Sequence, residues 1–115
     1  YSMLRRINYS DVVHKNKMTD HLKLSKVFYI DPTSLPIPKP VSPRNFPIFN
    51  YLKNSILTKG FDPSYPIIVR MNEKEYKEEK WKIDDRPSYI TDGNHRLVIA
   101  LELKLEKIPV RFVLN

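Results

Sequence analysis

The chain has 115 residues, enough for one domain with a single core. Hydrophobic residues make up 41% and charged residues 29%, a balance typical of a globular domain that argues against intrinsic disorder. No apolar run approaches the roughly 20 residues of a membrane span, so we expect no membrane partner. The absence of cysteine excludes disulfides, thiolate metal sites and cysteine nucleophiles.

The formal net charge is +7 and the isoelectric point lies near 9.6. Such a balance favours anionic partners: nucleotides, nucleic acid or an acidic protein. Lysine-rich stretches such as "EKEYKEEKWK" also suit a solvated surface. Charge alone therefore leaves the class of partner open.

Residues 1–26 are polar and basic, and their apolar residues are too irregularly spaced to predict an element, so we interpret them as a basic N-terminal extension. The chain begins with Tyr1 rather than methionine. We therefore expect an excised domain or a processed product. A partner protein, or other domains of the parent chain, would then contribute further function. The expected location is the cytoplasm, or a target cell's cytoplasm if the domain is delivered as part of a larger protein.

A β-branched and aromatic run, "VFYI", predicts a strand over 27–30 that ends at an Asp-Pro turn signal. Six prolines follow between Pro32 and Pro47. Because proline lacks an amide hydrogen and fixes φ, this segment predicts a stiff extended loop rather than a helix or a central strand. Such a loop either presents side chains at a site or merely connects two elements.

The segment "NFPIFNYLKNSILTKGF" predicts a helix. Pro47 suits a first helical turn, and Phe49, Leu52 and Ile56 recur on one helical face. Gly60 stands where a left-handed C-terminal cap belongs.

The rest of the chain predicts alternating elements. These are a buried strand at 65–71, an exposed charged hairpin or loop at 72–87 with Tyr76 and Trp81 folding back on the core, a short strand at 88–91, a helix at 94–105 and a closing strand at 106–114. Helices between strands predict a single α+β domain over 27–115, a mixed β-sheet with helices packed on it.

The stretch "TDGNHRL" joins the predicted strand at 88–91 to the helix at 94–105. Gly93 lies where the chain must turn, and the first amides of the helix have no acceptors within it. A phosphate group would accept from those amides and gain from the helix dipole. Arg96 would add a charge-assisted contact, and Asn94 would either cap the helix or touch the ligand.

Two side chains of this stretch are candidate catalytic residues. Asp92 suits a magnesium ligand or a base, and His95 suits proton transfer or hydrogen bonding near neutral pH. The alternative is a capped turn whose arginine is simply exposed. In either case we expect His95 and Arg96 to be at least partly exposed on the first helical turn, so that replacing them leaves the domain folded.

The stretch "YITDGNHRLVIALELKLEKIPVRFV" resembles the central motif of the ParB/sulfiredoxin superfamily, and the likeness extends over about residues 27–114. Upstream, "FYIDPTSL", "SPRNF", "LKNSILTKGF" and "YPIIVR" are similar to successive elements of ParB N-terminal domains. The resemblance implies the ParB/sulfiredoxin fold, with the functional turn at the start of the last helix. It also implies that Arg44, in "SPRNF", approaches the turn.

Members of this superfamily differ in function. The nucleophilic cysteine of sulfiredoxins is replaced here by Asn94, which excludes their repair chemistry. Against the CTP-binding turn of ParB proteins, Gly93 and Arg96 match, whereas Asn94, His95 and Val98 differ. The turn looks closer to the Asp-Gly-His-His-Arg turn of a free-serine kinase, although the loop glutamate of that kinase has no counterpart.

The resemblance and the residues together predict a domain that binds a nucleotide polyphosphate, with ATP, ADP and CTP unresolved, together with Mg²⁺ held by Asp92. Gly93, Asn94, His95, Arg96 and Arg44 would bind the phosphates. Hydrolysis or phosphoryl transfer would use Asp92 and His95. The alternative, from another class, is a nucleic-acid-binding or nuclease-like effector or toxin domain, favoured by the net charge and the basic N-terminal residues.

Overall fold

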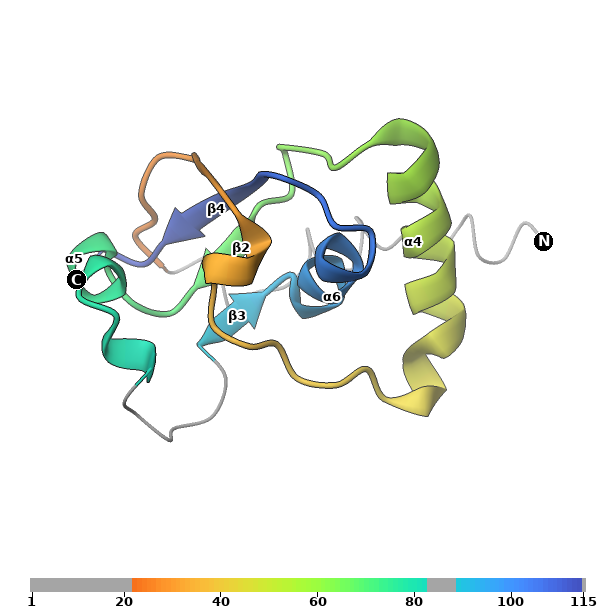
Figure 1. Cartoon of the computed structure of the whole chain (residues 1–115), viewed down its shortest axis with the longest axis horizontal. Helices are drawn as coiled ribbons and strands as arrows, with labels where there is room; N and C mark the ends of the chain where they lie inside the picture. Colours follow the sequence, from red (N-terminus) through yellow and green to blue (C-terminus); the bar gives the residue numbers. More distant parts are fainter. Residues whose placement is uncertain (1–21, 83–88, 115) are drawn as a thin grey trace.

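The computed structural model of the protein describes residues 22–82 and 89–114 (Figure 1). Within these residues no helix is both long and apolar enough to cross a membrane. The elements follow one another as β1 (Phe28–Ile30), the 3-10 turns η1 (Pro32–Ser34) and η2 (Pro43–Asn45), α4 (Phe46–Lys59), β2 (Ile67–Val69), α5 (Glu73–Lys77), the 3-10 turn η3 (Lys80–Lys82), β3 (Ile90–Asp92), α6 (Asn94–Glu102) and β4 (Ile108–Phe112).

The strands form one mixed sheet in the order β1-β4-β2-β3. β4 pairs antiparallel with β1 and parallel with β2, while β2 pairs antiparallel with β3. The central strands β2 and β4 are almost wholly buried, which explains their near-continuous apolar sequences. The prediction of a mixed α+β domain is confirmed.

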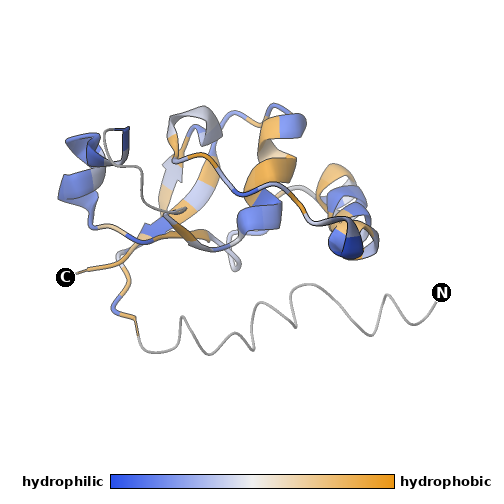
Figure 2. Ribbon diagram, turned by 90° about the horizontal axis from the view of Figure 1, so that it is seen from below, coloured by the Kyte–Doolittle hydropathy of each residue, from blue (hydrophilic) through white to orange (hydrophobic). Residues whose placement is uncertain are grey.

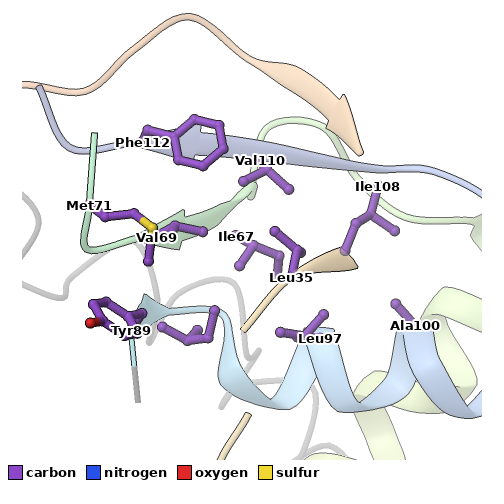
Figure 3. Packing of buried hydrophobic residues seen from close by; sticks show 11 residues of the cluster. Leu35, Ile67, Val69, Met71, Tyr89, Leu97, Ala100, Ile108, Val110 and Phe112 are labelled. Carbon is purple, nitrogen blue, oxygen red and sulfur yellow. The ribbon is translucent and has the colours of Figure 1, made fainter. Parts of the chain in front are cut away.

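α6 covers one face of this sheet and carries the main core. Figure 3 shows Leu97 and Ala100 of α6 facing the side chains of β2 and β4, with Leu35 from the loop after β1 beside them. Leu97, Ala100 and the β4 residues Ile108 and Val110 are completely buried. This packing fixes the start of α6 against the end of β3.

α4 forms the next layer, so that α6 lies between the sheet and α4 (Figure 1). The predicted face of Phe49, Leu52 and Ile56 is buried and packs against Ile99 of α6. Gly60 ends the helix with φ +82°, and its amide donates to the Ile56 carbonyl at 2.8 Å. The helix prediction and its end at Gly60 are confirmed, but with ψ 175° the glycine is not in the left-handed helical conformation that was predicted for the cap.

The expectation of an exposed hairpin or loop at 72–87 is wrong for its first half. Asn72 begins α5 with a capping box: its side chain accepts from the Glu75 amide at 2.8 Å, and the Glu75 carboxylate accepts from the Asn72 amide at 3.1 Å. A Glu73–Lys77 ion pair spans one turn of the helix. Figure 2 shows α5 as a hydrophilic ribbon, whereas hydrophobic residues gather on the sheet and α6. Residues 83–88 lie outside the described part.

Tyr76 and Trp81 both fold back on the main core, as predicted. The Tyr76 ring lies 5.0 Å from that of Phe112, and its hydroxyl bonds to Ser34. These aromatic contacts attach an otherwise polar segment to the sheet.

The fold also includes residues that the sequence interpretation assigned to the N-terminal extension. Leu24 forms an isolated bridge with Val113, and the Ser25 amide donates to the Phe112 carbonyl at 2.7 Å. The Ser25 hydroxyl in turn accepts from the Phe112 amide at 2.8 Å. The folded domain therefore begins before residue 27.

Candidate functional site

The "TDGNHRL" stretch forms a sharp turn from β3 into α6. Gly93 is the N-cap, with φ +88° and ψ 22° in the left-handed region, and the Leu97 amide donates to its carbonyl at 2.8 Å to close the first turn. The amides of Asn94, His95 and Arg96 precede that bond, so no carbonyl within α6 can accept from them. The predicted strand–turn–helix arrangement is confirmed.

Glycine is required at this position for two reasons. Its left-handed φ strains any other L-residue. In addition, a Cβ at Gly93 would lie 2.7 Å from Ile67 Cδ1 and 2.9 Å from Arg96 Nη2. The turn is thus enclosed between the central strand β2 and the guanidinium of its own helix.

Arg96 differs from the sequence expectation. Its side chain is only 4% exposed, and its guanidinium lies over Gly93, 3.7 Å from the Asp92 carboxylate, which is itself 11% exposed. The expectation of a partly exposed arginine is wrong, because the Arg96 side chain points back toward the helix N-terminus and packs against Gly93 rather than pointing into solvent. The geometry makes Arg96 a brace that joins the two sides of Gly93.

Burial shifts the pKa values of both candidate catalytic groups. Burial raises the pKa of Asp92, and the opposing effects of Arg96 and of the Gly93 amide are smaller, because a 3.7 Å pair attracts weakly compared with the loss of hydration. Burial also lowers the pKa of His95, whose ring stands edge-on to Phe49 with centroids 6.0 Å apart. His95, which is half-buried, is therefore neutral at physiological pH.

Asn94 does not cap the helix, since Gly93 is the N-cap and no side chain bonds there. Its amide instead bonds to the proline loop. Asn94 Oδ1 accepts from the Lys39 amide and Asn94 Nδ2 donates to the Lys39 carbonyl, each at 2.8 Å. Asn94 thus fastens the loop to the first turn of α6.

Arg44 lies in η2, exposed, at the far end of the proline loop from Lys39. In the described part of the chain, no hydrogen bond or ion pair joins Arg44 to the Asp92–Arg96 turn. The structure therefore brings the five turn residues together, and no contact among the described residues brings Arg44 to them.

Lys39 is the site residue that sequence reasoning missed. Its backbone is held beside the first turn of α6, and its side chain is exposed. Nothing in the sequence links it to Asn94, which lies 55 positions away. The only hint in the sequence is that Lys39 lies between Pro38 and Pro40. This position predicts a stiff backbone with an exposed positive charge, but no contact with Asn94.

The residues around Asp92 fit a magnesium ion poorly. Magnesium prefers one or two accessible carboxylates with room for water, whereas Asp92 is nearly buried and faces the Arg96 guanidinium. Across residues 22–82 and 89–114, no three histidine, aspartate or glutamate side chains gather where they could hold a metal.

Comparison with known proteins returned no match: no protein-family model fits the chain, and no curated protein or solved structure is significantly similar to it. The likeness to the ParB/sulfiredoxin superfamily stays a prediction from sequence.

Proposed function

We propose that the domain binds the phosphate groups of a nucleotide at the first turn of α6. The observation that carries this proposal is the double hydrogen bond between Asn94 and the backbone of Lys39. It holds the backbone of Lys39, whose side chain is exposed, beside the positive end of a helix whose first amides have no acceptor within the helix. Phosphate is the ligand chemistry that these groups share.

Each turn residue has a part in this proposal. The amides of Asn94, His95 and Arg96 donate to the phosphate oxygens. Gly93 permits the turn. Arg44 and Lys39 supply positive charge from the loop, while the Arg96 guanidinium keeps Asp92 and Gly93 in place rather than contacting the ligand.

If the bound nucleotide is also hydrolysed or transferred, His95 is the residue suited to accept a proton, because it is half-buried and neutral at physiological pH. Asp92 is less suited, since it is nearly buried beside Arg96. His95→Ala should then lower the rate by roughly 10²–10⁴-fold and leave nucleotide affinity nearly intact.

The test is calorimetric titration of the full chain with ATP, CTP, GTP, UTP and ADP. We expect at least one of them to bind, and Lys39→Ala to weaken it by about 3–10-fold, which corresponds to the roughly 0.5–1.5 kcal/mol that a typical hydrogen bond contributes. Lys74→Ala is the matched control, because Lys74 is an exposed lysine on α5, away from the turn (Figure 1). Failure of all five nucleotides to bind rejects the proposal.

The same titrations separate nucleotide binding from the nucleic-acid alternative. Affinity for a duplex oligonucleotide falls steeply between 50 and 200 mM salt, by about 10³–10⁵-fold for a protein that contacts 6–10 phosphates. Nucleotide binding at a single turn should fall far less over that range. Tight, steeply salt-dependent oligonucleotide binding without nucleotide binding would favour the alternative.

A further inference from the structure

The loop between η1 and α4 has a sequence that restricts its backbone to one shape. In residues 35–43, "LPIPKPVSP", every residue except Val41 is a proline or precedes one. Proline fixes φ near −65°, and a residue before proline is driven to extended or polyproline II torsions. Leu35, with φ −92° and ψ 161°, and Ser42, with φ −67° and ψ 139°, have such torsions near the two ends. Residues 35–42 are therefore extended with polyproline II torsions and form a short rod, which ends where Pro43 begins η2.

One face of this rod is exposed at each of its positions, whereas a second face combines the buried Pro36 with the exposed Lys39 and Ser42. Ile37 is 83% exposed, and Pro40 and Pro43 are exposed as well, whereas Pro38 and Val41 are half-buried. Because polyproline II has three residues per turn, Ile37, Pro40 and Pro43 share one face. We call these three residues the outer ridge.

The rod is fastened to the domain from its inner side. Leu35 is in the main core at 3% exposure, Val41 packs on the α4–α6 cluster, and the Lys39 backbone bonds to Asn94. Figure 1 shows the rod along the lower edge of the molecule, from η1 to α4. A partner that binds the outer ridge thus meets a preordered segment, so that the rod itself loses little conformational entropy on binding.

Two cations flank the ridge. Lys39 and Arg44 are exposed, and neither forms an ion pair within the described residues. Pro40, Val41, Ser42 and Pro43 have the Pro-x-x-Pro spacing that aromatic-lined grooves recognise, and Arg44 follows directly. A matching groove would have aromatic walls for the ridge and acidic side chains at its rim.

We propose that the outer ridge is a docking site for a protein module with an acidic-rimmed, SH3-type aromatic groove. The proposal does not rest on nucleotide binding, because the three ridge residues are exposed and take no part in the Asn94 bonds. A nucleic acid would bind the neighbouring positive charges, and an exposed isoleucine and two rigid prolines would add little to that binding. They suit a groove that buries apolar side chains at fixed spacing.

The test is titration of the ¹⁵N-labelled full chain with a panel of purified SH3 domains that differ in groove charge. Acidic-groove domains should shift the amide signals of Ile37, Lys39, Val41, Ser42 and Arg44, with dissociation constants below about 1 mM. The double variant Pro40→Ala/Pro43→Ala should weaken binding about tenfold or more. Pro63→Ala is the control, because Pro63 is exposed but lies outside the rod.

Charge reversal distinguishes groove recognition from plain electrostatic attraction. Lys39→Glu and Arg44→Glu should weaken binding to acidic-groove domains without altering the remaining spectrum, which reports the fold. If the charge variants lose binding while the double proline variant keeps it, the contact is electrostatic and the docking site is rejected. Binding by none of the acidic-groove domains also rejects it, as does a shift map that avoids the rod.

Discussion

The side-chain amide of Asn94 bonds to both the N–H and the C=O of Lys39, each at 2.8 Å, and so joins two residues 55 positions apart. An asparagine amide carries one acceptor and two donors, so it can pair with an extended backbone as a neighbouring strand would. This pairing places the proline rod on the first turn of α6. The candidate phosphate site and the outer ridge both depend on it.

Asn94→Ala should release the rod at Lys39. Two hydrogen bonds are lost, each contributing about 0.5–1.5 kcal/mol, but the Lys39 backbone groups regain water and alanine favours the helix, so the net loss of stability should be about 1 kcal/mol. Hydrogen exchange at the Lys39 amide should accelerate several-fold. Asn50→Ala, an exposed asparagine of α4, is the control. Unchanged exchange at Lys39 would contradict the anchoring role.

Gly93→Ala should destabilise the domain by at least about 2 kcal/mol, because a left-handed φ and a steric clash act together. The nearest atom to the new Cβ is Ile67 Cδ1. Ile67→Val removes that atom, so the double variant should lose less stability than the sum of the two single losses. Urea unfolding of the four proteins measures this coupling. Simple additivity would mean that the clash is relieved elsewhere.

Arg96→Ala should destabilise the domain by about 3–5 kcal/mol, the usual cost of leaving one partner of a buried ion pair alone. Removing both charges with Asp92→Asn/Arg96→Met should restore much of this loss, since methionine keeps most of the buried volume. Thermal or urea unfolding measures both variants. If Arg96→Ala instead keeps full stability and abolishes nucleotide binding, the arginine is a ligand contact and not a brace.

Stability should fall on acidification because of His95. An unfolded histidine takes up a proton near pH 6.5, whereas burial gives folded His95 a lower pKa. Between the two pKa values the unfolded state binds more protons, so the free energy of unfolding decreases as pH falls below 6.5. Above that pH the effect is absent.

The variant His95→Gln isolates this contribution. The difference in urea midpoint between the wild type and His95→Gln should be constant above pH 7 and should shift against the wild type as the pH falls toward 5, the region where a histidine ordinarily titrates. The variant is needed because Asp92 has the opposite effect on stability. Its pKa is raised by burial, so the folded state takes up this proton at a higher pH than the unfolded state does, and the free energy of unfolding increases on acidification. A difference that is flat across the whole range would show that His95 titrates as in the unfolded chain.

The sequence predicted the elements whose signals are local. The apolar face of α4 follows from helical spacing, its end at Gly60 from the glycine after its last turn, and the extended loop from the prolines. The turn at Gly93 was predicted for the same reason, since a strand that passes directly into a helix requires unusual torsions. One local signal was overlooked: the Asn72 and Glu75 capping box starts α5 within a segment read as a loop.

Only the tertiary structure decided what the turn residues do. The sequence places Arg96 on a first helical turn, where side chains commonly face solvent, but its burial depends on β2 lying beneath Gly93. The partner of Asn94 likewise depends on where the proline rod passes, and that is fixed by the packing of Leu35 and Val41 rather than by any local preference. Spacing along the chain determines which side chains share an element, whereas long-range packing determines which of them face solvent.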